Sequence, residues 1–389
     1  MRKICIVTGT RAEWGLLSGL AARLRAEPSV QLQILATNMH LSPKFGRTVD
    51  EIRRDGFDVD WEVAMIDEQA QSAPAETVRA MGREMTSLAT ALSGLRPDLL
   101  VILGDRYEML VAASAALLFD IPVAHLHGGE ITEGAVDDSI RHAITKLSAL
   151  HFTSTADYRR RVIQMGESPD RVFHVGALGC ENALKVPRLS RAELEESIGF
   201  ALMDKCFLVT YHPVTREGVS DAREQVEQLL IALDAFPDYR VLLTAPNSDV
   251  GGDDIAAALH RYCETSADRV CFVPSLGKVR YLSALPLMSA VIGNSSSGLI
   301  EVPSFGVPTV NVGHRQDGRV LADSVVCCGN DRDEIERAVR AALEPSFRAR
   351  CKACVNPYAK SGTADAIVRC LMQADLCALR KKPFYDLER

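Results

Sequence analysis

A chain of 389 residues exceeds the size at which a single hydrophobic core keeps growing, so two domains are expected. Hydrophobic residues make up 47% of the chain and charged residues 24%, a balance typical of globular proteins that excludes disordered and fibrous classes. The formal net charge is −7 and the Lys and Arg residues are scattered, which excludes an extended nucleic-acid-binding face.

Short apolar runs alternate with helical stretches along the whole chain. The candidate strands are, in order, "KICIVTG", "VQLQILAT", "DLLVILGD", "IPVAHLH", "LHFTST", "RVFHVG", "CFLVTYHP", "YRVLLTAP", "RVCFVP", "SAVIGNS", "VPTVNVG" and "SVVCCG". This alternation predicts parallel sheets with helices on both faces, and the strands suffice for two sheets. We therefore expect an α/β protein with two Rossmann-type doubly wound domains flanking a cleft.

No apolar run approaches the roughly 20 residues that a membrane-spanning helix needs, and the N-terminus lacks a signal-peptide pattern. A cytoplasmic protein without a membrane partner is expected. Several of the eleven cysteines lie in strand-like runs, where a reduced thiol behaves as a small hydrophobe. The single C-x-x-C, Cys351 to Cys354, has no second pair or nearby histidine at zinc-site spacing, so no metal site is predicted.

Five polar clusters follow predicted strands. They are "GTRAEWG" (9–15), "GDRYE" (104–108), "LHGGEITEGAVDDSIRHAITK" (126–146), "YHPVT" (211–215) and "GNSSSGLIE" (293–301). Ligands of open α/β sheets bind beyond the carboxyl ends of the strands, so these clusters predict an active cleft. Neither "GTRAEWG" nor "GNSSSGLIE" matches the dinucleotide-binding pattern G-x-G-x-x-G, and the sequence contains no P-loop motif G-x-x-x-x-G-K-[ST]. This argues against NAD chemistry and ATP hydrolysis. No cofactor is expected.

The last of these clusters suits a diphosphate. A Ser/Gly loop that opens a helix presents backbone N–H groups and hydroxyls at the positive end of the helix dipole, although ordinary helix capping explains the same serines. The candidate ligands are Asn294, Ser295, Ser296, Ser297 and Gly298, with Glu301 placed for a pair of ribose hydroxyls. Arg11 and Arg106 could each hold a phosphate by two hydrogen bonds, or pack along the domain edge.

Proton carriers concentrate after two successive strands. The candidates are Asp105, Glu130, Asp137 and Asp138, with His127 and His142 in the same neighbourhood. A carboxylate or imidazole whose pKa is tuned by burial or by neighbouring charges can remove or deliver a proton. An ordinary buried histidine is the alternative reading of His127.

Together the motifs "VTGTRAEWG", "LGDRYE", "HGGEITEGAVDDSIRHAITKLSALHF", "YHPVT" and "IGNSSSGLIEVPSFGVPTVNVG" resemble the sugar-nucleotide 2-epimerases, almost end to end. The resemblance is to the hydrolysing branch that makes N-acetylmannosamine-type sugars for sialic or related nonulosonic acids. It implies a GT-B-like fold, with an N-terminal domain over 1–178, a UDP-binding domain over 179–367 and a C-terminal helix, about 368–389, that returns to the first domain. It also implies a homodimer.

The resemblance further implies that a UDP-sugar loses its C2 proton and UDP to give a glycal, to which water and a proton then add with inversion at C2. In this scheme Asp105 and one Asp of the pair Asp137/Asp138 are catalytic carboxylates, Arg141 belongs to the same motif, and His212 serves the leaving diphosphate. Much of the wider family has His-x-Glu where this chain has His127 at the Glu position. The base is therefore either Glu130 or His127.

Three alternatives stay open from the sequence. The sugar is UDP-N-acetylglucosamine or its 2,4-diacetamido-2,4,6-trideoxy analogue of the legionaminic acid pathway. A GT-B glycosyltransferase has the same two-domain architecture, since fold does not fix function. A non-catalytic UDP-sugar sensor would bind the same ligand without turnover.

Overall fold

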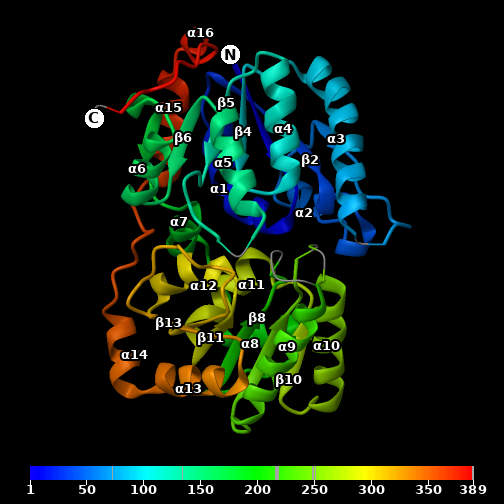
Figure 1. Cartoon of the computed structure of the whole chain (residues 1–389), viewed down its shortest axis with the longest axis vertical. Coiled ribbons are helices and arrows are strands. Elements are labelled where there is room, and N and C mark those ends of the chain that lie inside the picture. The colour runs from blue at the N-terminus through cyan, green and yellow to red at the C-terminus, as the bar shows by residue number, and fades with distance from the viewer. Residues whose placement is uncertain (72, 134, 215–218, 248, 250, 388–389) are drawn as a thin grey trace. The chain divides into compact units, whose positions relative to one another are not determined.

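The structure is a computed structural model that describes residues 1–71, 73–133, 135–214, 219–247, 249 and 251–387, so Thr215 of the "YHPVT" motif lies outside the described residues. The chain divides into two compact units (Figure 1). Unit 1 comprises Met1–Glu130, Asp137–Asn182 and Tyr358–Arg389, and unit 2 comprises Ile131–Val136 and Ala183–Pro357.

Unit 1 is built on a parallel sheet of seven strands in the order β3-β2-β1-β4-β5-β6-β7. Its strands are β1 (Arg2–Thr8), β2 (Val30–Thr37), β3 (Trp61–Val63), β4 (Leu99–Leu103), β5 (Val123–Leu126), β6 (Leu150–Thr153) and β7 (Val172–His174). Its helices are α1 (Arg11–Arg25), α2 (Val49–Arg54), α3 (Pro74–Leu95), α4 (Tyr107–Leu118), α5 (Asp137–Leu147), α6 (Ala156–Gln164), α15 (Thr363–Gln373) and α16 (Leu376–Leu379), with short 3₁₀ turns at Asn38–His40, Pro43–Phe45 and Pro169–Arg171.

The alternation of side chains along β1 explains the two apolar layers of unit 1. Ile4 and Ile6 join the core formed with α1 and α15, whereas Cys5 and Val7 join the core formed with α3, α4 and α5. A strand buried on both faces reads as a continuous apolar run, which is why "ICIV" has no polar residue. Figure 1 shows α3 and α4 side by side over one face of this sheet.

Unit 2 repeats the scheme with six parallel strands in the order β10-β9-β8-β11-β12-β13. They are β8 (Cys206–Thr210), β9 (Arg240–Thr244), β10 (Val270–Val273), β11 (Ala290–Gly293), β12 (Thr309–Val312) and β13 (Val325–Cys328). Its helices are α8 (Arg191–Ile198), α9 (Val219–Asp234), α10 (Gly252–Thr265), α11 (Gly277–Ala284), α12 (Ser296–Ile300), α13 (Arg332–Leu343) and α14 (Pro345–Lys352), with 3₁₀ turns at Leu285–Leu287 and Val302–Phe305. Helix α7 (Leu178–Lys185) crosses the division between the units at Asn182.

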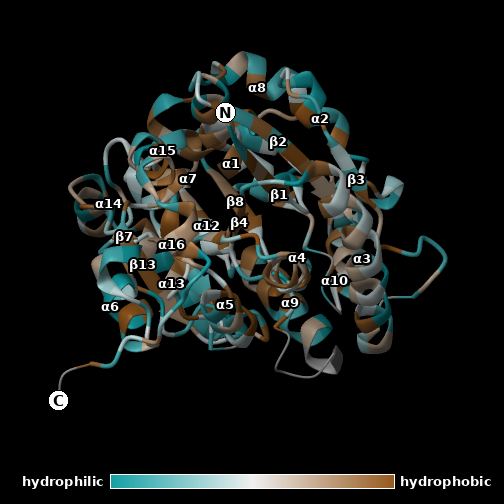
Figure 2. Ribbon diagram, turned by 90° about the horizontal axis from the view of Figure 1, so that it is seen from above, coloured by the Kyte–Doolittle hydropathy of each residue, from teal (hydrophilic) through white to brown (hydrophobic). Residues whose placement is uncertain are grey.

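The sheet of unit 2 is likewise covered on both faces. Phe207 and Val209 of β8 pack with α9, α10 and α13, and Cys206 and Leu208 pack with α8 and α11. In Figure 2 the strands labelled β4 and β8 carry hydrophobic colour, while the peripheral helix α6 shows hydrophilic turns. This is the burial pattern that the apolar runs of the sequence predict.

The predicted strands are all present, and the two doubly wound parallel sheets confirm the predicted fold class. The sequence prediction missed β3, which is only three residues long. Where one returning helix was predicted over about 368–389, the structure has α15 and the short α16, followed by a segment without regular structure up to Leu387. The limits 1–178 and 179–367 for the N-terminal domain and the UDP-binding domain remain a prediction. Within the described residues, no helix is long and apolar enough to cross a membrane.

Candidate active site

The carboxyl ends of β4 and β5 are joined by a backbone hydrogen bond from Gly104 N–H to the carbonyl of Leu126, at 3.0 Å. Gly104 has φ +85°, a conformation that glycine adopts without strain, and it turns the chain so that Asp105 follows directly. His125 of β5 contacts the same turn, because its Nε2 lies 2.7 Å from the Gly104 carbonyl oxygen. Burial lowers the pKa of His125 to about 3, so this ring is neutral.

Arg141 is the centre of the polar cluster in unit 1. It lies in the second turn of α5 and only 1% of it is exposed. Its guanidinium pairs with the carboxylate of Asp105, donates to Asp138 Oδ1 at 3.1 Å and donates to the backbone carbonyl of Glu130 at 2.8 Å. A buried guanidinium needs such acceptors, and its rigid fork fixes three segments of chain relative to one another.

His127 and Glu130 form a second hydrogen-bonded pair in this cluster. His127 Nδ1 lies 3.0 Å from Glu130 Oε1, and Ser154 Oγ donates to the same oxygen at 2.7 Å. His127 has φ +67°, a conformation that costs a non-glycine residue free energy and that clusters at functional sites. Its Nε2 is buried without a hydrogen-bond partner among the described residues. The ring is therefore oriented at Nδ1 and available for a ligand at Nε2.

Asp137 and Asp138 occupy the first turn of α5, where the helix dipole favours negative charge. Asp138 pairs with Arg141 through Oδ1, and its second oxygen lies 3.7 Å from His142 Nε2. Burial lowers the pKa of His142, and the carboxylate of Asp138 only partly offsets this.

Arg11 and Arg106 follow β1 and β4. Arg11 Nη2 pairs with Glu51 Oε1 at 2.7 Å, and Arg106 Nε donates to Glu108 Oε1 at 3.0 Å. Glu108 is fully buried, and a Cβ at Gly9 would come within 2.6 Å of its Oε1, so only glycine fits there.

Two further buried carboxylates accompany Glu108. Glu13 caps α1 by accepting from Thr10 N–H at 3.2 Å and also accepts from Gly9 N–H at 2.7 Å. Glu84 of α3 accepts from Thr37 Oγ1 at 3.2 Å. Burial, followed by the charge of Glu108, raises the pKa of both Glu13 and Glu84 above the usual range. These acids were not predicted as site residues.

In unit 2 the loops after β8 and β11 are held together by a reciprocal pair of hydrogen bonds. His212 N–H donates to Asn294 Oδ1 at 2.7 Å, and Asn294 Nδ2 donates to the His212 carbonyl at 2.8 Å. The strand order reverses between β8 and β11, the position at which doubly wound sheets bind ligands. His212 Nδ1 accepts from the backbone N–H of Asn247 at 3.0 Å, so the neutral ring carries its hydrogen on Nε2 and can donate it.

The serine-rich loop continues from Asn294 into α12. Ser295 is the N-cap of this helix, Ser296 is its first residue, and Ser297 Oγ contacts the hydroxyl of Tyr281. Glu301 follows at the end of α12 and is 9% exposed. Burial, together with the charge of Glu301, raises the pKa of Tyr281, so the phenol keeps its proton.

Gly298 shows why a small residue is needed in α12. Its Cβ, if present, would come within 2.9 Å of Thr309 Cγ2, so the helix lies directly against β12.

The structure thus brings the predicted site residues into two groups. In unit 1, contacts link Asp105, Glu130, His127, Asp138 and Arg141. In unit 2, a hydrogen bond joins His212 to Asn294. Sequence reasoning missed Ser154, Asn247 and Tyr281, because each reaches the group from a distant segment without a local motif. Among the described residues, no set of three or more His, Cys, Asp or Glu side chains is arranged to hold a metal ion.

The chain is similar to known proteins along nearly its whole length. The chain is 37% identical over 387 residues to the GDP/UDP-N,N'-diacetylbacillosamine 2-epimerase (hydrolyzing) of Campylobacter jejuni, covering 99% of both chains. It is 36% identical over 391 residues to the polysialic acid biosynthesis protein P7 of Escherichia coli, covering 100% of this chain and 98% of that one.

The crystal structure of UDP-GlcNAc 2-epimerase from Neisseria meningitidis bound to UDP-GlcNAc has the same fold, with a TM-score of 0.81 at 18% identity over 96% of this chain and 100% of that chain. A family model described as UDP-N-acetylglucosamine 2-epimerase matches residues 22–372. The chain belongs to the UDP-N-acetylglucosamine 2-epimerase family.

Proposed function

We propose that the protein is a hydrolysing 2-epimerase that converts UDP-N-acetylglucosamine and water into UDP and N-acetylmannosamine. The observation that carries the proposal is the acidic cluster of unit 1, in which Arg141 holds Asp105, Asp138 and the backbone of Glu130 together. Inversion at C2 requires a proton carrier on each face of the sugar ring, and this cluster supplies several carboxylates.

The reaction has two balanced steps. In the first, a base removes the C2 proton while the C1–oxygen bond to UDP breaks, which gives a glycal. In the second, a base takes one proton from water as the water oxygen bonds to C1, and an acid delivers a proton to C2 from the face opposite the one from which the first proton left. Asp105, Glu130 and the pair Asp137/Asp138 are the proposed proton carriers.

The contact between His127 and Glu130 changes how the first base is assigned. The two side chains share a hydrogen bond at 3.0 Å, so a proton taken up by one can be shared with the other. We assign the proton-transfer role to the pair, with Ser154 and the backbone of Phe152 fixing its orientation by hydrogen bonds.

The group in unit 2 is proposed to hold UDP. His212 donates from Nε2 to the leaving diphosphate, and the loop of Asn294, Ser295, Ser296, Ser297 and Gly298 supplies further donors. Glu301 accepts from the ribose hydroxyls. Arg11 and Arg106, which belong to unit 1, are proposed to bind the phosphate that is attached to the sugar. We expect turnover without an added metal or cofactor, so activity lost to a chelator and restored by Mg²⁺ would contradict this scheme.

One experiment separates the proposal from its main competitor. Incubation with UDP-N-acetylglucosamine in D₂O, followed by NMR, should give UDP and free N-acetylmannosamine that carries deuterium at C2. A GT-B glycosyltransferase would be inert without an acceptor, and a sensor would bind the nucleotide sugar without consuming it.

A second substrate is favoured by a specific observation. The Campylobacter jejuni relative, similar over 99% of both chains, is named for N,N'-diacetylbacillosamine, whereas the Escherichia coli relative is named for polysialic acid biosynthesis. The same reaction on UDP-2,4-diacetamido-2,4,6-trideoxyglucose would feed the legionaminic acid pathway. The ratio of kcat/KM for the two sugars decides, since a site that pairs polar groups discriminates strongly against a substrate that leaves them unpaired.

A further inference from the structure

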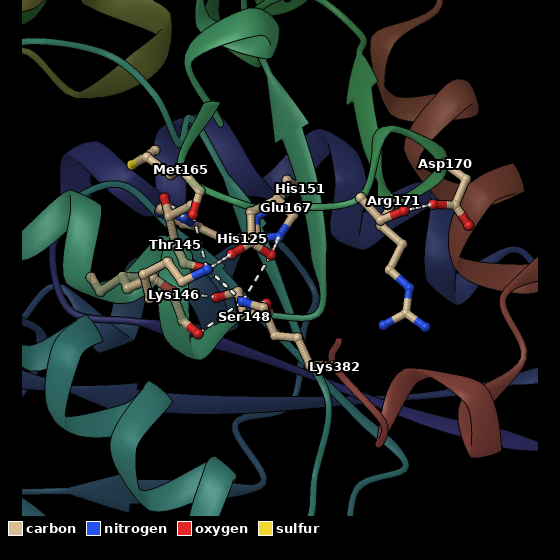
Figure 3. A network of polar contacts seen from close by, with 12 residues as sticks. His125, Thr145, Lys146, Ser148, His151, Met165, Glu167, Asp170, Arg171 and Lys382 are labelled. Carbon is tan, nitrogen blue, oxygen red and sulfur yellow. Dashed lines mark hydrogen bonds and ion pairs between the residues drawn. The ribbon is translucent and has the colours of Figure 1, made fainter. Parts of the chain in front are cut away.

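A buried carboxylate near the carboxyl end of α5 collects three cationic or hydrogen-bonding side chains (Figure 3). Glu167 has a side chain only 3% exposed, and it lies 2.7 Å from Lys146 Nζ, 2.9 Å from His151 Nε2 and 2.9 Å from Lys382 Nζ. Lys146 is the penultimate residue of α5, whereas Lys382 comes from the C-terminal segment of the chain. No part of the proposed reaction uses this cluster.

Lys382 also caps α5. Its ammonium donates to the backbone carbonyls of Thr145, Lys146 and Ser148 at 3.0, 2.8 and 2.5 Å. The last carbonyls of a helix have no partner within the helix, and a positive charge there is favoured by the helix dipole. The three ammonium hydrogens are thus shared among three carbonyls and the carboxylate of Glu167.

The segment that carries Lys382 is fixed on both sides of it. Arg171 donates to the carbonyls of Ala378 and Lys381, each at 2.9 Å, and Tyr385 N–H donates to the carbonyl of Gly166 at 2.9 Å. A Cβ at Gly166 would lie 2.3 Å from the ring of Phe384, so the ring sits directly on this glycine. The ammonium is therefore held in place by the tail rather than being a mobile surface charge.

Helix α5 carries proposed catalytic groups at its other end, the amino-terminal one. Asp137 and Asp138 form its first turn, and Arg141 links it to Asp105 and to the backbone of Glu130. Thr145 connects the two ends, because its Oγ1 donates to the Arg141 carbonyl at 3.1 Å. An eleven-residue helix moves largely as one body, so a shift of its capped end displaces the acids.

We propose that Lys382 is a positioning residue of the active site, which fixes the carboxyl end of α5 and thereby holds Asp137, Asp138 and Arg141 in reacting geometry. This inference rests on the proposed function, since it concerns the acids to which that function assigns proton transfer. A displacement of about 1 Å at a reacting group can cost on the order of 10²-fold in rate.

The test compares Lys382→Met, which keeps the length of the side chain but removes its donors, with Lys381→Met. Lys381 is the exposed neighbour, so its substitution is the matched control. Lys382→Met should lower kcat by about 10- to 100-fold, with KM for the nucleotide sugar and the Kd for UDP within about threefold of wild type. Lys382→Arg keeps the charge and should recover part of the lost kcat, whereas Lys381→Met should match wild type.

Hydrogen exchange separates positioning from loss of folding. In Lys382→Met the amides of α5 should exchange faster while those of α3 and α9 keep wild-type protection. Wild-type kcat in Lys382→Met, or a loss of kcat accompanied by faster exchange throughout the chain, would overturn the proposal.

Should Lys382→Met fail to fold, Phe384→Ala loosens the same tail at a side chain that is 66% exposed, and it should lower kcat by about threefold. An unchanged kcat in Phe384→Ala would then overturn the positioning role of the segment that carries Lys382. A wild-type protein that turns over neither nucleotide sugar refutes the proposed function itself, and this outcome is distinct from the others.

Discussion

At the scale of single residues, the clearest consequence of the structure is that His127 and Glu130 act together. Glu130→Gln preserves the acceptor for Ser154 and removes the carboxylate, and His127→Asn removes the imidazole at the strained backbone position. Each should lower kcat by about 10²–10⁴-fold, the usual cost of losing a positioned acid or base. Calorimetry should show an unchanged Kd for UDP in both variants.

The control for this pair is Asp157→Asn, a half-exposed carboxylate on α6 that pairs with Arg160 and should leave kcat unchanged. Near-normal turnover in Glu130→Gln with collapse in His127→Asn would assign the base to the histidine alone. Near-normal turnover in both would remove the pair from the mechanism.

Glu84 should make the stability of the protein depend on pH. Burial, followed by the charges of Glu108 and Glu13, raises its pKa well above 4.5, so the folded state keeps a proton that the unfolded chain has already released. Stability contributed by this group therefore falls as pH rises above about 4.5. Glu84→Gln removes the titration and keeps an acceptor for Thr37.

Urea unfolding at two pH values measures this effect. At pH 8 Glu84→Gln should be more stable than wild type, because the buried carboxyl of the wild type keeps a proton that the unfolded chain has released, and the advantage should shrink at pH 5. Glu68→Gln, which alters an exposed carboxylate, should show no such pH-dependent difference. A variant less stable than wild type at both pH values would mean that the charged form of Glu84 stabilises the fold.

At the scale of elements, hydrophobic patterning predicted the strands because buried parallel strands read as apolar runs between turns. β3 (Trp61–Val63) was not predicted because three residues are too few to form an apolar run, and one of them is an exposed glutamate. The returning segment was misjudged as one helix because Ala374 to Asp375 leaves the helical conformation without a proline or glycine to mark it.

The candidate site was predicted in part for an equally physical reason. Asp105, Glu130 and His212 follow strands directly, so topology brings their segments to strand ends. The partners that orient them, such as Ser154 and Asn247, are set by tertiary packing between segments far apart in the chain. No local spacing encodes such contacts.

The ends of β8 and β11 lie so close together that position 293 has no room for a side chain. Gly293 has φ +134°, and a Cβ there would lie 1.9 Å from the Thr210 carbonyl oxygen. Gly293→Ala should push apart the strand ends that carry His212 and Asn294. We expect a loss of about 1–3 kcal/mol in stability from backbone strain alone, together with at least tenfold weaker UDP binding.

Gly82→Ala is the matched control, because nothing lies within 4 Å of its Cβ position in α3 and alanine is the better helix former. It should be neutral or stabilising by about 0.5–1 kcal/mol. Thermal unfolding and UDP calorimetry measure both variants. Wild-type UDP affinity in Gly293→Ala would show that the reciprocal hydrogen bonds are not needed for binding.

At the scale of the whole molecule, the chain builds most of unit 1, then all of unit 2 apart from Ile131–Val136, and then returns. Ile367 and Leu371 of α15 belong to the same core as α1 and β1, and Arg2 donates to the carbonyl of Ala374 at 2.9 Å. Strand β1 thus shares a core with α15, which follows unit 2 in the chain. Unit 1 cannot complete this core until α15 has been synthesised.

Unit 1 also exposes apolar side chains where a second copy could bind. Leu117, Leu118 and Phe119 at the end of α4 are 56%, 81% and 40% exposed, and contiguous exposed apolar surface of this kind marks interaction sites. We predict a homodimer through helices of unit 1 that include α4, so light scattering at micromolar concentration should give twice the chain mass of 42.4 kDa.

Leu118→Glu places a charge in the exposed apolar surface at the end of α4 and should shift the mass to the monomer value. Val355→Glu, at an 86% exposed position in unit 2, should leave the dimer intact. A wild-type mass of 42.4 kDa would refute the dimer, and a dimeric Leu118→Glu protein would place the interface elsewhere.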